Sequence, residues 1–156
     1  LKELESISPN SITKSSSGQL YKVDLPDEHI AKMLDWDKPL SQQAPEVQKI
    51  IKTSDFYKQA KDYQKATGAS YNDPSTRTGE GILKYMRSGT TDEMGNAGPW
   101  SGGKSAEEYL KSIGIPGIRY LDGGSRSAGQ GSSNFVVFPG NEGLLSILER
   151  NGKPIK

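Results

Sequence analysis

The residues best suited to chemistry lie in one stretch near the end of the chain, from Gly114 to Phe138. Two short apolar runs, Ile118–Leu121 and Phe135–Phe138, enclose a segment made almost wholly of glycine, serine and other polar residues. Two buried strands joined by an adaptable polar loop are a common way to build a binding site. Asn134 stands at the mouth of the second run, where a polar side chain can face a ligand while its neighbours pack.

Charged residues near this loop could add anion binding. Arg119 and Arg126 can each donate paired hydrogen bonds to a phosphate or carboxylate. Arg126 is the better candidate, because a strand arginine such as Arg119 more often faces solvent. Asp35 and Asp37 flank Trp36 and resemble a pair of acids, but this spacing puts them on one face only in an extended segment. The preferred interpretation is a loop anchored by Trp36, with its acids in water.

Two further motifs are weaker. Residues Gly98–Ser105 read GPWSGGKS and fit the phosphate-binding P-loop pattern G-x-x-x-x-G-K-S. The buried strand that should precede a P-loop is missing, so a flexible loop leading into a capped helix is the preferred interpretation. His29 is the only histidine. Because no triad or metal cluster can be built around it, we predict no metal site.

Composition limits the classes of protein that remain. The chain has 156 residues, no cysteine and a net charge of +1, which suits one domain without disulfides or Cys-ligated zinc. The mixed charges argue against a nucleic-acid partner or a membrane surface. No apolar run approaches the ~20 residues of a membrane span. Because the chain begins with Leu1 and not methionine, we expect a processed product or a fragment of a longer protein.

The pattern along the chain predicts an α+β fold. Alternation predicts a strand at Gln19–Leu25, and apolar runs predict strands at Ile118–Leu121, Asn134–Phe138 and Leu144–Glu149. The apolar side chains expected in the core of these strands are Val23, Ile118, Tyr120, Val136 and Ile147. We expect a single domain over residues 19–156, preceded by a helical segment and connector over residues 1–18.

Helical spacing and end signals predict the helices. The ranges are Asp27–Met33, Pro45–Ile51, Phe56–Thr67, Thr78–Arg87 and Ser105–Ile113. The last is the best marked, because Ser105 and Glu108 have the spacing of a capping box and Gly114 can stop the helix.

Four blocks of the sequence resemble a known family. LYKVDLPDE, MLDWDKPLS, GIPGIRYLDGGSR and SNFVVF resemble the later part of the ADP-ribosyltransferase-like domain in the large polyvalent proteins of phages and mobile elements. The resemblance implies small split antiparallel or mixed β-sheets with several short helices. It also implies NAD as a substrate, a protein target, a toxin or effector role, and a place in the bacterial host cytoplasm.

The resemblance also assigns roles to residues. In this class a glutamate at the start of a strand acts in catalysis, and the segment Ser133–Phe138 is similar to that pattern with Asn134 in the glutamate's place. The resemblance therefore implies that Asn134 is the catalytic position and that Ser133 and Asn134 contact NAD. It likewise implies that Asp122, Ser125 and Arg126 belong to a target-recognition loop.

Two departures from the class affect the expected activity. Asn134 cannot carry the charge that stabilises an oxocarbenium-like transition state. The first two motifs of the class lie upstream of the LYKVDLP-like strand, where this chain has only residues 1–18 and no histidine. We therefore expect a mono-ADP-ribosyltransferase-like domain that is partial or non-catalytic, or that needs a further segment. The alternative is a non-catalytic protein-interaction module of a phage or mobile element.

Overall fold

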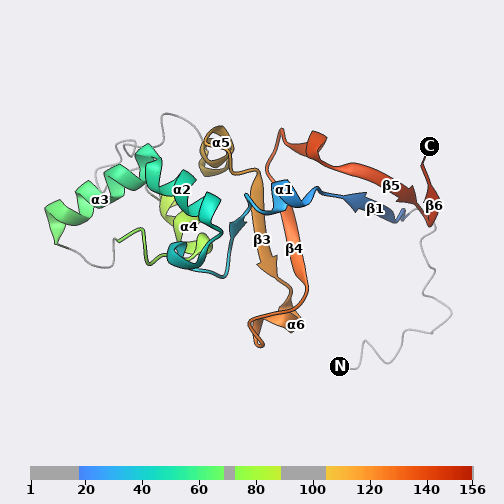
Figure 1. Ribbon diagram of the computed structural model, residues 1–156, viewed down its shortest axis with the longest axis horizontal. Coiled ribbons are helices and arrows are strands. Elements are labelled where there is room, and N and C mark those ends of the chain that lie inside the picture. Colours follow the sequence, from blue (N-terminus) through green and yellow to red (C-terminus); the bar gives the residue numbers. More distant parts are fainter. Residues whose placement is uncertain (1–17, 69–72, 89–104, 156) are drawn as a thin grey trace, which may run out of the picture. The chain divides into compact units, whose positions relative to one another are not determined.

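The computed structural model describes residues 18–68, 73–88 and 105–155 (Figure 1). These residues fall into two compact units. The first joins the chain up to Asp24 with the segment from Ser146 onward, and the second is Leu25–Leu145. Within these ranges, six α-helices and two small sheets, one antiparallel and one mixed, confirm the predicted α+β class. Whether residues 19–156 act as a single domain stays a prediction.

The first unit is an antiparallel sheet. Its strands, in spatial order, are β1 (Tyr21–Asp24), β5 (Ser146–Arg150) and β6 (Lys153–Pro154). Asn151 and Gly152 connect β5 to β6 with φ angles of 51° and 76°, the left-handed backbone that an Asn-Gly hairpin turn requires. The Asn151 side chain also accepts a hydrogen bond from the Leu20 N–H at 2.8 Å. The turn residue therefore anchors the chain just before β1.

The second unit contains the mixed sheet, in which β3 is central. Its strands are β2 (Leu34–Asp35), β3 (Gly117–Leu121) and β4 (Ser133–Val137), with β2 parallel and β4 antiparallel to β3. A Cβ atom on Gly117 would lie 2.2 Å from the Val136 carbonyl oxygen. Only glycine therefore allows β3 and β4 to approach this closely at that point.

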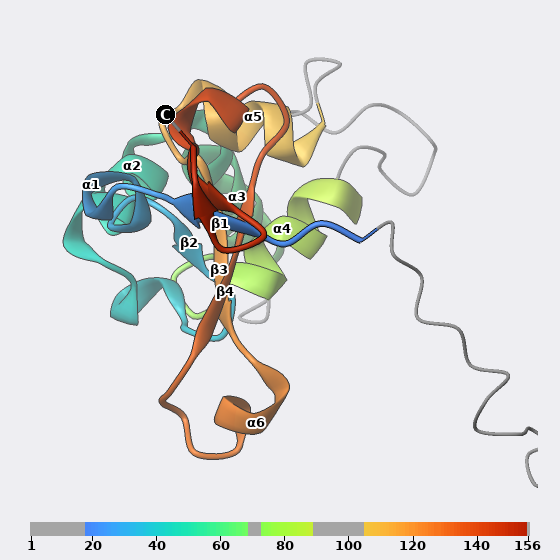
Figure 2. The same ribbon diagram turned by 90° about the vertical axis from the view of Figure 1, so that its right-hand side faces the viewer.

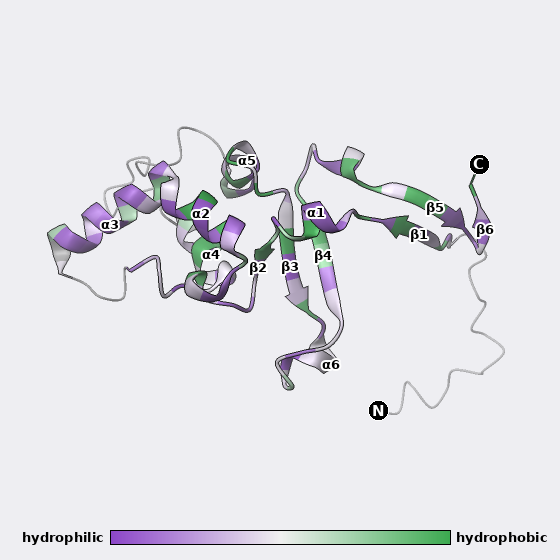
Figure 3. Cartoon of the chain, in the orientation of Figure 1, coloured by the Kyte–Doolittle hydropathy of each residue, from purple (hydrophilic) through white to green (hydrophobic). Residues whose placement is uncertain are grey.

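Helices build most of the core of the second unit. They are α1 (Asp27–Ile30), α2 (Pro45–Thr53), α3 (Asp55–Thr67), α4 (Gly79–Ser88), α5 (Ala106–Ser112) and α6 (Gly123–Arg126). Figure 3 shows hydrophobic and hydrophilic residues interspersed along α2 and α4, as amphipathic helices require. The buried cluster includes Leu34, Ile51, Phe56, Ile82 and Leu110. Figure 2 shows α6 at the far end of the β3–β4 ribbon, away from α2 and α5.

Local signals explain where the helices begin and end. The predicted capping box is confirmed: the Glu108 N–H donates to Ser105 Oγ at 3.2 Å, and the Ser105 N–H donates to the Glu108 carboxylate at 2.8 Å. Ser54 caps α3 by accepting from the Tyr57 N–H. Gly68 ends α3 with a φ of 68°, the left-handed backbone common at helix C-termini.

The predicted strand core is wrong at three positions. Val23, Val136 and Ile147 are 50%, 43% and 51% exposed, whereas Ile118 and Tyr120 are partly buried. The buried residues lie mainly on the helices, with Leu34, Ile115 and Phe138 adjoining them. An apolar run indicates a strand, but it does not indicate which of its faces another element covers.

Several short elements of the structure were not predicted. The two-residue strands β2 and β6 were not predicted, because two residues cannot display a period. The polar loop Asp122–Ser133 begins with one helical turn, α6, because Asp122 caps it. The expected N-terminal helical segment lies outside the described residues. Within the described ranges, no helix has both the length and the apolar character needed to cross a bilayer.

Candidate functional site

A polar pocket of about 550 Å³ lies in the second unit, where the loop after β2 meets the end of β3 and the segment from α6 to β4. Ligand sites commonly have volumes of roughly 300–1,000 Å³. The charged side chains that line this pocket are Asp35, Asp37, Lys38, Arg119 and Arg126. Three cations against two carboxylates leave one net positive charge. The pocket therefore favours a ligand that carries negative charge.

Asp35 is a buried carboxylate held between two cations. Its Oδ2 lies 3.2 Å from Arg119 Nε and 3.5 Å from Lys38 Nζ. A buried carboxylate requires such partners, because leaving it unpaired away from water would be strongly destabilising. Arg119 was expected on the solvent face, but the structure pairs it with this carboxylate at the pocket wall.

Asp37 joins the loop to β3 and α6. One carboxylate oxygen accepts a hydrogen bond from the Leu121 N–H at 2.8 Å, and the other lies 3.7 Å from Arg126 Nε. The Arg126 guanidinium also lies 5.6 Å from the centre of the Tyr120 ring, within the range of a cation–π contact. The interpretation of Asp35 and Asp37 as acids in water is therefore wrong for Asp35, which is buried. Asp37 is exposed, as expected, but its carboxylate also contacts β3 and α6.

Arg126 differs from Arg119 in how firmly it is held. The Arg126 side chain is 51% exposed and its carboxylate partner is distant, whereas Arg119 is 34% exposed and its partner Asp35 is closer and more buried. A guanidinium has five N–H donors, so Arg126 keeps donors available for a ligand. Anion binding by Arg126 stays a prediction.

The buried side chain of Gln43 fixes the backbone of the loop. Its Oε1 accepts from the Asp35 N–H at 2.8 Å, and its Nε2 donates to the carbonyls of Asp35 and Lys38, each at 2.7 Å. The amide thus pairs with the edge of β2 as a neighbouring strand would. This pairing sets the position of the Asp35 carboxylate at the pocket.

The start of α4 supports the same loop from another side. The Gly79 N–H donates to the Lys38 carbonyl, and the Glu80 N–H donates to the Trp36 carbonyl, both at 3.1 Å. A Cβ atom on Gly79 would lie 2.3 Å from the Asp35 carbonyl oxygen, so a larger residue cannot occupy this position without displacing backbone. Close approach of α4 to the loop therefore depends on glycine.

Sequence reasoning missed both supporting residues. Gly79 left a weak signal, because glycine is a poor helix former at the start of a predicted helix. Gln43 left none, since nothing in its sequence neighbourhood distinguishes it from an exposed glutamine.

The two predicted NAD-contacting residues are placed differently. Ser133 lines the pocket, whereas Asn134 is exposed on β4 and is not among the pocket residues. Asn134 pairs in register with Tyr120, and Ser133 with Leu121. Because successive strand residues point to opposite faces, adjacency in sequence does not bring both side chains to one site.

The three predicted target-recognition residues also differ in what they contact. Asp122 Oδ1 accepts from the Ser125 N–H at 2.8 Å, and the backbone hydrogen bond from Ser125 lowers the pKa of the Asp122 carboxyl below its ordinary value. Ser125 Oγ in turn accepts from the Ser132 N–H at 3.0 Å. Asp122 and Ser125 thus shape the loop, while Arg126 reaches the pocket. Target recognition by these three residues stays a prediction.

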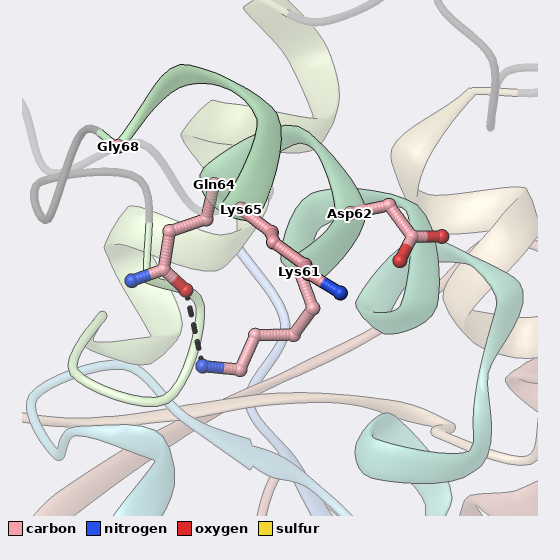
Figure 4. Close-up of a pocket in the computed structure, with 5 residues that line it drawn as sticks. All are labelled: Lys61, Asp62, Gln64, Lys65 and Gly68. Atoms are coloured by element: carbon pink, nitrogen blue, oxygen red, sulfur yellow. Dashed lines mark hydrogen bonds between the residues drawn. The ribbon is translucent and has the colours of Figure 1, made fainter.

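A separate depression, of about 430 Å³, lies on α3. Figure 4 shows its five residues, among which a hydrogen bond of 3.1 Å joins Lys61 Nζ to Gln64 Oε1. Lys61 Nζ also lies 3.1 Å from Asp73. The Asp62 and Lys65 side chains extend away from this hydrogen-bonded pair. Because these groups do not converge, this is a solvated helix face and a weaker candidate.

Comparisons with known proteins add no assignment. No family model matches the chain, and neither the curated proteins nor the solved structures yield a match. Among the described residues, no group of three or more His, Cys, Asp or Glu side chains could hold a metal ion. The function is therefore argued from the polar pocket and its chemistry.

Proposed function

We propose that this chain is an ADP-ribosyltransferase-like domain that binds NAD in the polar pocket around Asp35 and Arg126. The observation that carries the proposal is the meeting of two arginines, Lys38 and the Ser133 hydroxyl at one pocket with a net positive charge. Guanidinium groups suit the paired oxygens of a pyrophosphate. A serine hydroxyl can exchange hydrogen bonds with a ribose hydroxyl. The donor set therefore fits the ribose–phosphate part of NAD.

Efficient transfer does not follow from binding. Cleavage of the bond between ribose and nicotinamide develops positive charge on the ribose, which a carboxylate stabilises and an amide does not. Asn134 has only an amide and lies outside the pocket lining. The pocket carboxylates Asp35 and Asp37 are both held near cations. We therefore propose NAD binding with weak or absent transfer in this form.

Other parts of the proposal come from the family resemblance. These are a protein target met by the loop that contains Arg126, and a location in the bacterial host cytoplasm. They depend on NAD binding in the pocket, so that binding is tested first.

Isothermal titration of NAD into the whole chain tests the proposal. We expect saturable binding that Arg126→Ala weakens by about tenfold to a hundredfold, since a charge-assisted hydrogen bond contributes roughly 1.5–3 kcal/mol. The control is Arg150→Ala, which removes an exposed arginine from β5 in the first unit and should leave binding unchanged. No binding by the wild-type chain, or equal affinity in the Arg126→Ala variant, would overturn the proposal.

Exposed apolar residues on β4 favour a second candidate, the protein-interaction module. Phe135 and Val136 are 42% and 43% exposed, and β4 is the last strand of its sheet. An edge strand with apolar side chains can pair with an extended peptide. A peptide library selected on the chain should then yield extended apolar peptides. Their binding should be lost in Val136→Lys and kept in Arg126→Ala, and the opposite pattern would exclude this candidate.

A further inference from the structure

A second cavity, of about 320 Å³, adjoins the polar pocket. Both are lined by Asp35, Lys38, Gln42 and Arg119. Asp35, Lys38 and Arg119, which are joined by ion pairs, therefore form a wall that the two spaces share. A ligand that rests on this wall can reach both.

The rest of the second cavity is largely apolar. Its apolar lining consists of Ile30, Ala31, Met33, Ala44 and Pro45. These residues come from the end of α1, the segment before β2 and the start of α2. Met33 is the one buried residue among these five. A cavity of this composition favours an apolar or flat aromatic group.

The wall presents positive charge to a ligand. The side chains of Lys38 and Arg119 are 48% and 34% exposed, whereas that of Asp35 is only 12% exposed. The carboxylate is thus covered while the two cations that pair with it remain accessible. Arg126 adds a third cation on the polar side. An anion is therefore best placed at the wall, near Lys38.

We propose that the two cavities form one groove for a phosphate ester that carries an apolar or aromatic group. The phosphate lies against Lys38 and Arg126, and the attached group occupies the cavity above Met33. This inference rests on the proposed function for the phosphate end of the ligand, since NAD belongs to this class, and it adds a subsite for the group attached to the phosphate.

The test compares phenyl phosphate with inorganic phosphate by titration calorimetry on the whole chain. We expect phenyl phosphate to bind about tenfold more tightly, because the ring leaves water for the apolar cavity. Ala31→Trp fills the mouth of that cavity and should abolish the preference while leaving phosphate affinity unchanged. The matched control is Ala66→Trp on the exposed side of α3, which should retain the preference. Far-ultraviolet circular dichroism checks that both variants fold.

Three results would overturn the inference. They are equal affinities for the two probes, a preference that survives in Ala31→Trp, and no binding of either probe. The outcome is separable from that of the proposed function. If NAD binds without a phenyl phosphate preference, only the apolar subsite fails. If the preference is present but NAD does not bind, the subsite stands and NAD is not the ligand.

Discussion

At the scale of residues, the side chain of Gln43 fixes the backbone of the loop that carries Asp35 and Asp37. The amide of Gln43 makes three hydrogen bonds to the backbone of Asp35 and Lys38. These bonds hold the chain on both sides of Trp36, so they determine where both pocket carboxylates lie. Gln43 is therefore a positioning residue, although it does not line the polar pocket.

Replacement of Gln43 by alanine should lower the free energy of unfolding by about 1–3 kcal/mol, because buried backbone groups lose their partners. Urea denaturation followed by circular dichroism measures this change. Gln64→Ala removes a glutamine from the α3 surface and should change stability by less than about 0.5 kcal/mol. Equal effects of the two substitutions would show that the Gln43 amide does not support the loop.

At the scale of elements, the start of α4 holds the backbone of the loop after β2, which lines the pocket. Two backbone N–H groups of α4 donate to the loop after β2. The absence of a side chain at Gly79 permits this close approach. A second glycine of the same helix, Gly81, has ordinary spacing, since its nearest neighbour would be 3.4 Å from an added Cβ.

The two glycines give a matched pair of substitutions. Gly79→Ala should destabilise the chain by about 1–3 kcal/mol, since the new methyl group collides with backbone. Gly81→Ala should stabilise it by roughly 0.5–1 kcal/mol through the better helix propensity of alanine. Thermal and urea denaturation of both variants measure the difference. If Gly79→Ala were as stable as Gly81→Ala, the close approach of α4 to the loop would not depend on glycine at position 79.

The sequence predicted elements whose signals are local. The helix opened by Ser105 and Glu108 was found because a capping box can be read over four residues. The strands at Ile118–Leu121 and Asn134–Phe138 were found from apolar runs. Their burial was not predictable, because the exposure of Val136 depends on which distant elements pack near it. Gly79 escaped because its contacts lie in a segment far away in the sequence. The partners of Gln43 are only five and eight residues away, but no local pattern marks a side-chain amide that turns back onto the backbone of a loop.

At the scale of the whole molecule, ionised carboxylates make the free energy of unfolding depend on pH. Hydrogen bonds led by the Ser75 side chain lower the pKa of Asp73 to about 2. Hydrogen bonds from the backbone of Gly140 lower the pKa of Glu142. Burial raises the pKa of Glu107, but the hydrogen bond from Arg87 is among the interactions that outweigh it, so its pKa is lowered. In each case the folded state favours the ionised form.

Because these pKa values are depressed on folding, the unfolded chain binds more protons in acid. Their stabilising contribution should be present above about pH 4 and lost progressively as the pH falls towards about 2, where Asp73 becomes protonated in the folded state. Urea denaturation between pH 2.5 and 6 measures this slope, and Asp73→Asn should make it shallower. A slope that is unchanged in Asp73→Asn would contradict the role given to this carboxylate.

NAD binding in the polar pocket of the second unit is the proposal on which the target and the location depend. Amide chemical shifts of the isotope-labelled whole chain, followed during NAD titration, test it most directly. We expect saturable shifts concentrated at Asp35–Lys38, Arg119–Leu121 and Arg126–Ser133, and their loss in Arg126→Ala. The absence of saturable shifts, or shifts confined to other parts of the described chain such as α3, would contradict it.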